Sequence, residues 1–216
     1  LHELNGSIPP RVYQVTIDSD ETIWVCGAEN LAYRMPMRQW EIMRLDQLEA
    51  QCFAAGREGL LWIGTAQGIW SLETASGALS GPWRIGSPLV ANEVLNLLRV
   101  DGPDGDARLM VATPSGVSAI GPSGESEVVW RGDLACAEVD ALGRVWLGTG
   151  DGLYRLNADG SLSQRLVDEA VIALAFDGAQ PVVCTEDGRL LRVGQWGTRQ
   201  VLNVQEMTGT VQRSLV

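Results

Sequence analysis

The sequence predicts an all-β protein, a β-propeller with five recognisable four-stranded blades. Three observations predict this fold class: an internal repeat, apolar runs short enough for strands, and glycine-containing turns between those runs. No window has the apolar spacing of an amphipathic helix, and residues 46–50 form at most one helical turn. Four short strands in about 40 residues are typical of a propeller blade. The alternative is part of a six-bladed or larger ring.

The repeat is clearest in residues 56–72 and 140–156, which align without gaps and share the pattern Trp-aliphatic-Gly-Thr-x-x-Gly. Weaker copies follow the same plan around residues 18–33, 101–120 and 177–193. The equivalent positions 30, 68, 116, 152 and 188 are 38, 48, 36 and 36 residues apart. A proline- and glycine-rich insertion at 101–106 accounts for the longest interval. It superficially resembles a calcium loop but lacks the distal Glu and the spacing, so we expect a hairpin insertion.

Each copy divides into four expected strands. An apolar run such as 171–176 ends in a turn, and a Trp- or Val-centred run follows. After the Thr-x-x-Gly turn come an alternating strand and a more polar one, such as 162–167. We expect the first strand to be buried on both faces and the polar fourth strand to lie outermost. The expected repeat cores, within a single domain over 1–216, are about 12–44, 50–85, 94–130, 134–167 and 171–204.

Two further strands are expected at the ends of the chain, over residues 1–6 and 210–216. Residues 210–216 resemble the inner strand of another blade, and an exposed inner strand would be an aggregation-prone edge. We favour a closed five-bladed ring in which the terminal strands complete or decorate a blade. A piece of a larger propeller, completed by a partner chain at these strands, is the alternative. Position 1 is Leu rather than Met, which is compatible with a trimmed or cleaved chain.

Equivalent positions of the repeat carry similar side chains. One position has only small residues: Cys26, Gly64, Ala112, Gly148 and Cys184. Cys52 and Cys136 share a second position, and no Cys-x-x-Cys pair occurs. A crowded contact between blades explains these cysteines as small buried residues, although four cysteines would allow three disulfide pairings. A third position has the tryptophans expected to pack between blades: Trp24, Trp62 and Trp146.

Composition excludes several classes of function. The net charge is −11 and all sixteen basic residues are Arg, so no lysine can form a Schiff base or bind phosphate in a P-loop. This acidic charge disfavours nucleic acid as a partner. The single histidine, His2, and the spacing of the cysteines support no catalytic triad and no zinc site, so we expect no metal and no cofactor. No apolar run approaches a membrane span, and direct membrane insertion is not expected.

The segments 61–68 and 145–154 resemble the regulatory-propeller repeat of two-component systems. In that family, such repeats build the extracytoplasmic sensor region of hybrid histidine kinases. The resemblance therefore implies a sensor propeller that binds a ligand or a protein. It also favours a periplasmic or secreted location, as does the even number of cysteines. The chain opens without a signal-peptide pattern and lacks disulfide-dense spacing, which leaves the cytoplasm open.

Candidate site residues lie in two sets of loops that meet at one face of a propeller, which we call the rim. The lead-in loops, which precede the first strand of each blade, contribute Arg11, Glu49, Glu93, Asp133 and Glu169. The loops that join the second and third strands contribute Glu29, Asn30, Gln67, Ser115, Asp151, Glu186 and Asp187. The ligand-binding candidates are Arg11, Glu49, Glu93, Asp133, Glu169, Asp151 and Asp187. Converging carboxylates could bind a cation or a polyol, whereas the alternative is a set of solvated turn residues.

These observations favour a non-catalytic propeller that binds a small polar ligand or a protein surface. One alternative is a structural subunit whose ring is completed by, or docked on, another chain. Another is a propeller lyase or hydrolase in which a pair such as Glu93 and Asp133 acts as acid and base. Streptogramin-inactivating lyases resemble this blade plan but depend on histidine, and the repeats contain none. No catalytic residue is assigned, and whether the protein is an enzyme stays open.

Overall fold

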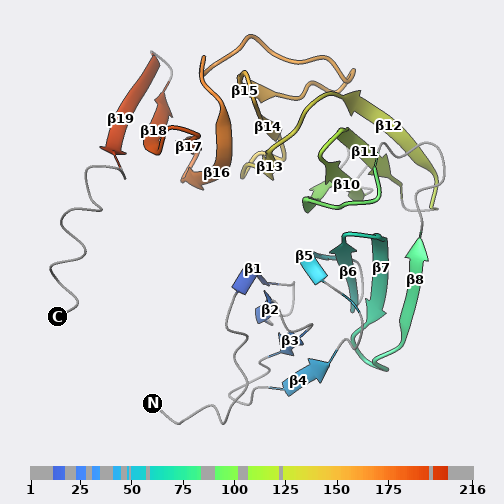
Figure 1. The fold of residues 1–216 in the computed structure, drawn as a ribbon. Coiled ribbons are helices and arrows are strands. Elements are labelled where there is room, and N and C mark those ends of the chain that lie inside the picture. The colour runs from blue at the N-terminus through green and yellow to red at the C-terminus, as the bar shows by residue number, and fades with distance from the viewer. Residues whose placement is uncertain are drawn as a thin grey trace, which may run out of the picture. The chain divides into compact units, whose positions relative to one another are not determined.

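A computed structural model (Figure 1) describes residues 12–17, 23–27, 31–34, 41–44, 48, 50–56, 59–83, 91–101, 107–121, 124–194 and 197–203. These residues form strands, turns and connecting segments. Among them, no helix has the length and hydrophobicity needed to span a membrane. The terminal strands expected at 1–6 and 210–216 lie outside the described residues.

The strands form five sheets in the described part of the chain, each built from consecutive strands (Figure 1). The first contains β1 (Val12–Ile17), β2 (Ile23–Gly27), β3 (Leu31–Arg34) and β4 (Glu41–Arg44). The second contains β5 (Ala50–Ala55), β6 (Leu60–Thr65), β7 (Gly68–Glu73) and β8 (Leu79–Trp83). The third contains β9 (Asn96–Asp101), β10 (Ala107–Thr113), β11 (Gly116–Ile120) and β12 (Ser126–Arg131). The fourth contains β13 (Cys136–Val139), β14 (Val145–Thr149) and β15 (Gly152–Arg155), and the fifth contains β16 (Val171–Asp177), β17 (Gln180–Thr185), β18 (Arg189–Gly194) and β19 (Gly197–Asn203).

Strands that follow one another in sequence are neighbours in every sheet, so each repeat folds as a meander of its own. A series of such meanders, each packing on the next, is the architecture of a propeller. The chain is a β-propeller, and the predicted fold class is confirmed.

The fourth sheet differs from the others at its outer edge. Between β15 and β16 the chain pairs only at two isolated bridges, which join Leu153 to Val167 and Leu156 to Leu162. Between the bridges, the backbone N–H of Arg155 donates to the Ser163 hydroxyl at 2.9 Å rather than to a backbone carbonyl. A side chain that takes the place of a backbone acceptor interrupts the ladder of hydrogen bonds. The outer strand expected in this repeat is therefore reduced to these bridges.

The chain contains two compact units, Leu1–Thr113 with Val117–Val128 (unit 1) and Pro114–Gly116 with Val129–Val216 (unit 2). Unit 1 contains the first two sheets and most of the third. Unit 2 contains the fourth and fifth sheets. A single domain over 1–216 and a closed ring of five blades stay predictions.

Within each unit, the hydrophobic core lies between consecutive sheets. In unit 1, Trp24 has no exposed surface and belongs to a cluster with Phe53 and Ile63 of the second sheet. In unit 2, Trp146 is 7% exposed and clusters with Val171 and Val183 of the fifth sheet. These contacts confirm that aromatic side chains at the repeated position pack between blades. Trp62, by contrast, is only partly buried.

The small residues of the repeat lie at a crowded contact between sheets. Cys52 pairs with Gly64, and Cys136 pairs with Gly148 in the same register. A Cβ atom on Gly64 would lie 2.4 Å from the Cys52 sulfur, and one on Gly148 would lie 2.4 Å from the Cys136 sulfur. Both distances are far below van der Waals contact, so these positions require glycine. Cys52, Cys136 and Cys184 form no disulfide with any residue that the structure describes.

The first strand of the fifth sheet, β16, is less buried than the sequence predicts. In β16, Val171 and Leu174 belong to the core between the fourth and fifth sheets, but Ile172 is 50% exposed and Ala175 is also exposed. The expectation that a first strand is buried on both faces is wrong for β16. A first strand is an edge strand of its own sheet, so its burial depends on what packs across each face.

Candidate functional site

The turns between second and third strands owe their Thr-x-x-Gly pattern to the fold. The threonines of this pattern are all buried: Thr65, Thr113, Thr149 and Thr185. The Thr149 hydroxyl accepts the N–H of Gly152 at 3.1 Å, and the Thr65 hydroxyl accepts the N–H of Gln67 at 3.0 Å. Gly152 has φ of 153°, and a Cβ there would lie 2.2 Å from the carbonyl oxygen of Val167. The pattern therefore builds the turn, and only the residues between Thr and Gly are free to bind a ligand.

Lead-in loops are attached to these turns by backbone hydrogen bonds. The N–H of Leu134 donates to the carbonyl of Pro114 at 3.0 Å, and that of Val94 donates to the carbonyl of Thr65 at 3.0 Å. In both cases the loop leading into one sheet meets the turn of the preceding sheet. In these two places, a lead-in loop and a turn between second and third strands lie together, as predicted for the rim.

Two of the predicted site residues, Asp133 and Asp151, line one pocket of about 440 Å³ in unit 2. We call it the rim pocket, and its lining residues are Trp130, Asp133, Thr149, Gly150, Asp151, Tyr154 and Leu162. Asp133 comes from the lead-in loop of β13, and Asp151 from the turn between β14 and β15. The pocket therefore combines two exposed carboxylates with two aromatic side chains.

The two carboxylates of the rim pocket differ in their partners. Asp151 accepts the Thr149 hydroxyl at 2.5 Å and the Tyr154 hydroxyl at 3.0 Å. These bonds, the one from Thr149 first, lower the pKa of Asp151, whereas burial and then the bond to Asp151 raise the pKa of Tyr154. Asp151 is thus an oriented, charged acceptor. The Asp133 carboxylate has no hydrogen bond or ion pair with any residue that the structure describes, and its oxygens are open to a ligand.

Glycine keeps the rim pocket open. A Cβ on Gly150 would meet nothing within 4 Å, and Gly150 is not among the glycines with positive φ. The equivalent position in the other turns carries larger residues: Ala66, Pro114 and Glu186. The turn therefore accepts a side chain at this position, and the fourth repeat leaves the space empty. A Cβ on Gly132 would lie 2.4 Å from the Trp130 ring, so the indole packs against this glycine.

Glu169 and Asp187 are joined by an arginine that the sequence analysis missed. Arg189 donates through Nε to Asp187 at 2.7 Å and through Nη2 to Glu169. The Thr185 hydroxyl also donates to Asp187 at 2.5 Å, and this bond, followed by those from Arg189, lowers the pKa of Asp187. Both carboxylates are therefore engaged within the protein. The only available indication in the sequence was an Arg immediately after the turn glycine, where the fourth repeat has Leu153.

The structure brings none of the remaining predicted residues that it describes into the rim pocket. Glu93 is exposed in unit 1 and Asp133 belongs to unit 2, so an acid–base pair of the two stays a prediction. Arg11, Glu49 and residues 102–106 of the insertion lie outside the described residues. Over the ranges that the structure describes, no three or more His, Cys, Asp or Glu side chains group as ligands for a metal ion.

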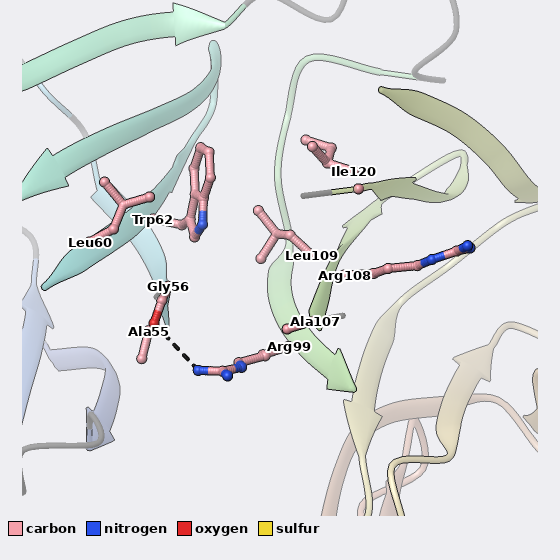
Figure 2. A pocket seen from close by; sticks show the side chains of 10 residues that line it. Ala55, Gly56, Leu60, Trp62, Arg99, Ala107, Arg108, Leu109 and Ile120 are labelled. Atoms are coloured by element: carbon pink, nitrogen blue, oxygen red, sulfur yellow. Dashed lines mark hydrogen bonds between the residues drawn. The ribbon is translucent and has the colours of Figure 1, made fainter. Parts of the chain in front are cut away.

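A second type of pocket lies between sheets, at the strand ends away from the Thr-x-x-Gly turns. In unit 1 its volume is about 160 Å³, and Figure 2 shows Trp62 and Leu109 on its walls. Arg99 of β9 reaches across and donates to the carbonyl of Gly56 at 3.3 Å (Figure 2). The corresponding groove of unit 2 is larger, about 670 Å³, and Trp146 lies at the equivalent place.

No protein-family model and no curated protein matches the chain. Among solved structures, it is similar to the extracellular domain of BT4673 from B. thetaiotaomicron, described as a hybrid two-component system. The TM-score is 0.61 and the identity 15%, over 89% of this chain and 33% of that one.

The fold is also similar to virginiamycin B lyase from Staphylococcus aureus, with a TM-score of 0.65 and 12% identity over 88% of this chain and 69% of the lyase. YCF48, solved with a D1 peptide, has a TM-score of 0.62 and 16% identity over 91% of this chain and 68% of that one. The chain thus spans a third of the BT4673 domain and about two thirds of the other two. Identities this low show a common propeller fold.

Proposed function

We propose that this chain is a non-catalytic, ligand-binding propeller, and that the rim pocket binds a small, neutral, polyhydroxylated molecule. The observation that carries the proposal is the meeting of Asp133 and Asp151 with Trp130 and Tyr154 around one cavity. Pockets that combine aromatic walls with a few convergent polar groups are the usual form of small-molecule sites. Carboxylates accept hydrogen bonds from hydroxyl groups, while the aromatic faces cover the C–H faces of the ligand.

The charges of the pocket select the ligand class. The charged side chains that line the rim pocket, Asp133 and Asp151, are both carboxylates. An anionic ligand would be repelled, and a neutral polyol would not. The likeness to the extracellular domain of BT4673 and the regulatory-propeller motifs support a sensing role outside the cytoplasm.

Gly150→Leu tests the proposal by filling the rim pocket. Calorimetry against a panel of monosaccharides, disaccharides and linear polyols is expected to find a ligand for the wild type. Gly150→Leu should abolish that binding. Asp133→Asn should weaken the affinity roughly tenfold, because the ligand loses a hydrogen bond to a charged acceptor. Glu186→Leu, the same turn position in the fifth repeat, is the matched control. Binding that survives Gly150→Leu, or no binding by any member of the panel, would count against this site.

A lyase is the second candidate, favoured by the similarity to virginiamycin B lyase. An alanine variant of a histidine in that lyase is described as catalytically inactive, in a complex with quinupristin. This chain has one histidine, His2, so a lyase reaction would require other residues as acid and base. Mass spectrometry of quinupristin incubated with the protein tests this candidate. Turnover lost in both Asp133→Asn and Glu93→Gln would support it, and no turnover would contradict it.

A structural subunit completed by another chain is the third candidate. The chain covers 69% of the lyase and 68% of YCF48, which leaves room for further strands in a complete ring. Light scattering after size-exclusion chromatography tests this candidate. A stable monomer would contradict obligate completion by a partner.

A further inference from the structure

The groove between the fourth and fifth sheets has a different chemistry from the rim pocket. We call it the basal groove and define it by Arg144, Trp146, Arg155, Gln164, Gln180 and Val193. It lies where β14 and β17 begin and where β15 and β18 end, whereas the rim pocket lies at the opposite ends of β14 and β15. Its volume of about 670 Å³ exceeds the 440 Å³ of the rim pocket. Two arginines and no acidic residue line it.

One of the two arginines is already neutralised. Arg144 donates through Nε to the Asp140 carboxylate at 2.6 Å, and its guanidinium lies 5.8 Å from the centre of the Trp146 ring. The buried Asp140 also accepts the indole N–H of Trp146 at 2.9 Å. Arg144 therefore forms part of the wall, with its position and charge fixed by Asp140.

Arg155 has no such partner. Its backbone forms hydrogen bonds with Ser163, but its guanidinium forms no ion pair with any residue that the structure describes. Other half-buried arginines of unit 2 each pair with a carboxylate: Arg144 with Asp140, Arg189 with Asp187, and Arg192 with Asp177. An unpaired, partly buried cation is unusual in a chain with a net charge of −11, because nearby acidic groups are abundant and burial of a lone charge is unfavourable.

We propose that the basal groove binds a small organic anion, with the guanidinium of Arg155 as the recognition group for its carboxylate or phosphate. A guanidinium offers a planar fork of donors that matches such oxyanions in a bidentate pair. The amides of Gln164 and Gln180 supply further donors, and Pro181 and Val193 supply an apolar wall for the body of the ligand. The proposal is independent of the rim pocket, since the rim pocket would select a neutral polyol and the basal groove an anion.

Calorimetric titration with benzoate and phenyl phosphate tests the proposal, with benzyl alcohol as the neutral analogue. The wild type should bind at least one of the anions and not the alcohol, and the preferred anion tells a carboxylate site from a phosphate site. Arg155→Gln should lower the affinity roughly tenfold or more, as expected for the loss of a charge-assisted pair. Arg199→Gln, which removes an exposed arginine of β19, should leave the affinity unchanged.

A second variant separates loss of binding from loss of structure. Ala179→Trp places a large ring in the basal groove from an exposed turn and leaves Arg155 in place. It should abolish anion binding while leaving any polyol binding at the rim pocket intact. Absence of binding by both anions, an affinity unchanged in Arg155→Gln, or an equal loss in Arg199→Gln would overturn the proposal.

Discussion

The second and fourth repeats have the most similar sequences, and they differ in one instructive place. Both have a cysteine facing a glycine, with a valine of the next repeat against the same point: Val94 for Gly64 and Val171 for Gly148. The Cys52 thiol lies 4.0 Å from the Val94 carbonyl, and the Cys136 thiol lies 3.9 Å from the Val171 carbonyl. At this contact the two repeats are nearly interchangeable.

They diverge around the tryptophan. In the fourth repeat, Trp146 is held by Asp140, which also binds Arg144. In the second repeat, Gly56 stands at the position of Asp140 and Leu60 at that of Arg144. The pocket that Trp62 lines is about 160 Å³, against about 670 Å³ for the groove that Trp146 lines. The shared motif therefore specifies how blades pack, whereas residues outside the motif decide which grooves lie between them.

Adding a methyl group at the shared contact should have the largest effect. Gly148→Ala places a Cβ 2.4 Å from the Cys136 sulfur and 2.8 Å from Val171. We expect the free energy of unfolding in urea to fall by about 3 kcal/mol, as for an overpacked core. Gly64→Ala should behave alike, and Gly150→Ala, which meets nothing within 4 Å, is the control.

The double variant Cys136→Ala with Gly148→Ala sharpens this prediction. The fifth repeat already pairs Ala173 with Cys184, so the contact tolerates bulk on either strand but not on both. The second change should recover part of the lost stability. A single Gly148→Ala variant as stable as the wild type would mean that the contact is looser than these distances indicate.

Removing Asp140 should have the next largest effect. Its carboxylate accepts hydrogen bonds from the N–H groups of Leu142 and Arg144 and from the side chains of Arg144 and Trp146. Asp140→Ala leaves these donors without their acceptor, and we expect a loss of about 2 kcal/mol. Calorimetric unfolding measures it, with Asp168→Ala, which removes an exposed carboxylate, as the control.

Introducing an aspartate at position 56 of the second repeat tests whether that repeat can hold its tryptophan as the fourth repeat does. A Cβ on Gly56 would lie 2.9 Å from the Leu60 carbonyl oxygen and 3.2 Å from Trp62 Nε1. Gly56→Asp should therefore destabilise the protein rather than create a second carboxylate anchor. A gain in stability would show that the second repeat can adopt the arrangement of the fourth.

The sequence predicted the fold because the repeat encodes local requirements. A buried threonine and a glycine with positive φ define the turns of the second to fifth repeats, and the size of one residue per strand defines the contact between sheets. For the same reason, the sequence could predict that Asp133 and Asp151 lie close together, since both lie in loops at one end of the strands. Positions within a repeat thus translate directly into positions within a blade.

The position of a residue in the repeat did not predict which neighbours its side chain contacts. Arg189 joins Glu169 to Asp187, and Arg155 forms no ion pair with any described residue, yet both arginines lie in the third strand of their sheet. The open space at Gly150 exists because this residue has no side chain. A search for motifs looks for side chains that are present and does not detect such a space. The interrupted outer strand of the fourth repeat depends on one hydroxyl, that of Ser163, as a substitute acceptor.

Acid should act on the fourth repeat through Asp140. Burial alone would raise the pKa of Asp140, but the hydrogen bonds from Trp146 and Arg144 outweigh it and lower the pKa below the ordinary 3.8. The folded state therefore binds this proton more weakly than the unfolded state, and the stabilisation is complete above the ordinary value. It is lost as the pH falls from about 3.8 through the lower folded pKa.

Urea unfolding at pH 6, 4 and 3 (set around the ordinary carboxyl pKa of about 3.9) measures this contribution as the difference between wild type and Asp140→Asn. That difference should shrink at the lowest pH, whereas the difference for Asp168→Asn should stay near zero throughout. An Asp140→Asn difference independent of pH would assign the effect to shape rather than to charge.

The thiol of Cys136 offers the smallest perturbation of the contact that the two repeats share. Burial, and then the neighbouring Glu138, raise its pKa to about 12, so the thiolate is scarce at neutral pH. Because the thiolate is the nucleophile, iodoacetamide at pH 8 (near the pKa of an unperturbed thiol, about 8.5) should leave Cys136 unmodified in the folded protein and alkylate it in urea. Peptide mass spectrometry measures both. Gly148→Ala, by pushing against the sulfur, should speed the alkylation in the folded state, and an alkylation rate equal to that in urea would show that the contact between the fourth and fifth sheets opens freely.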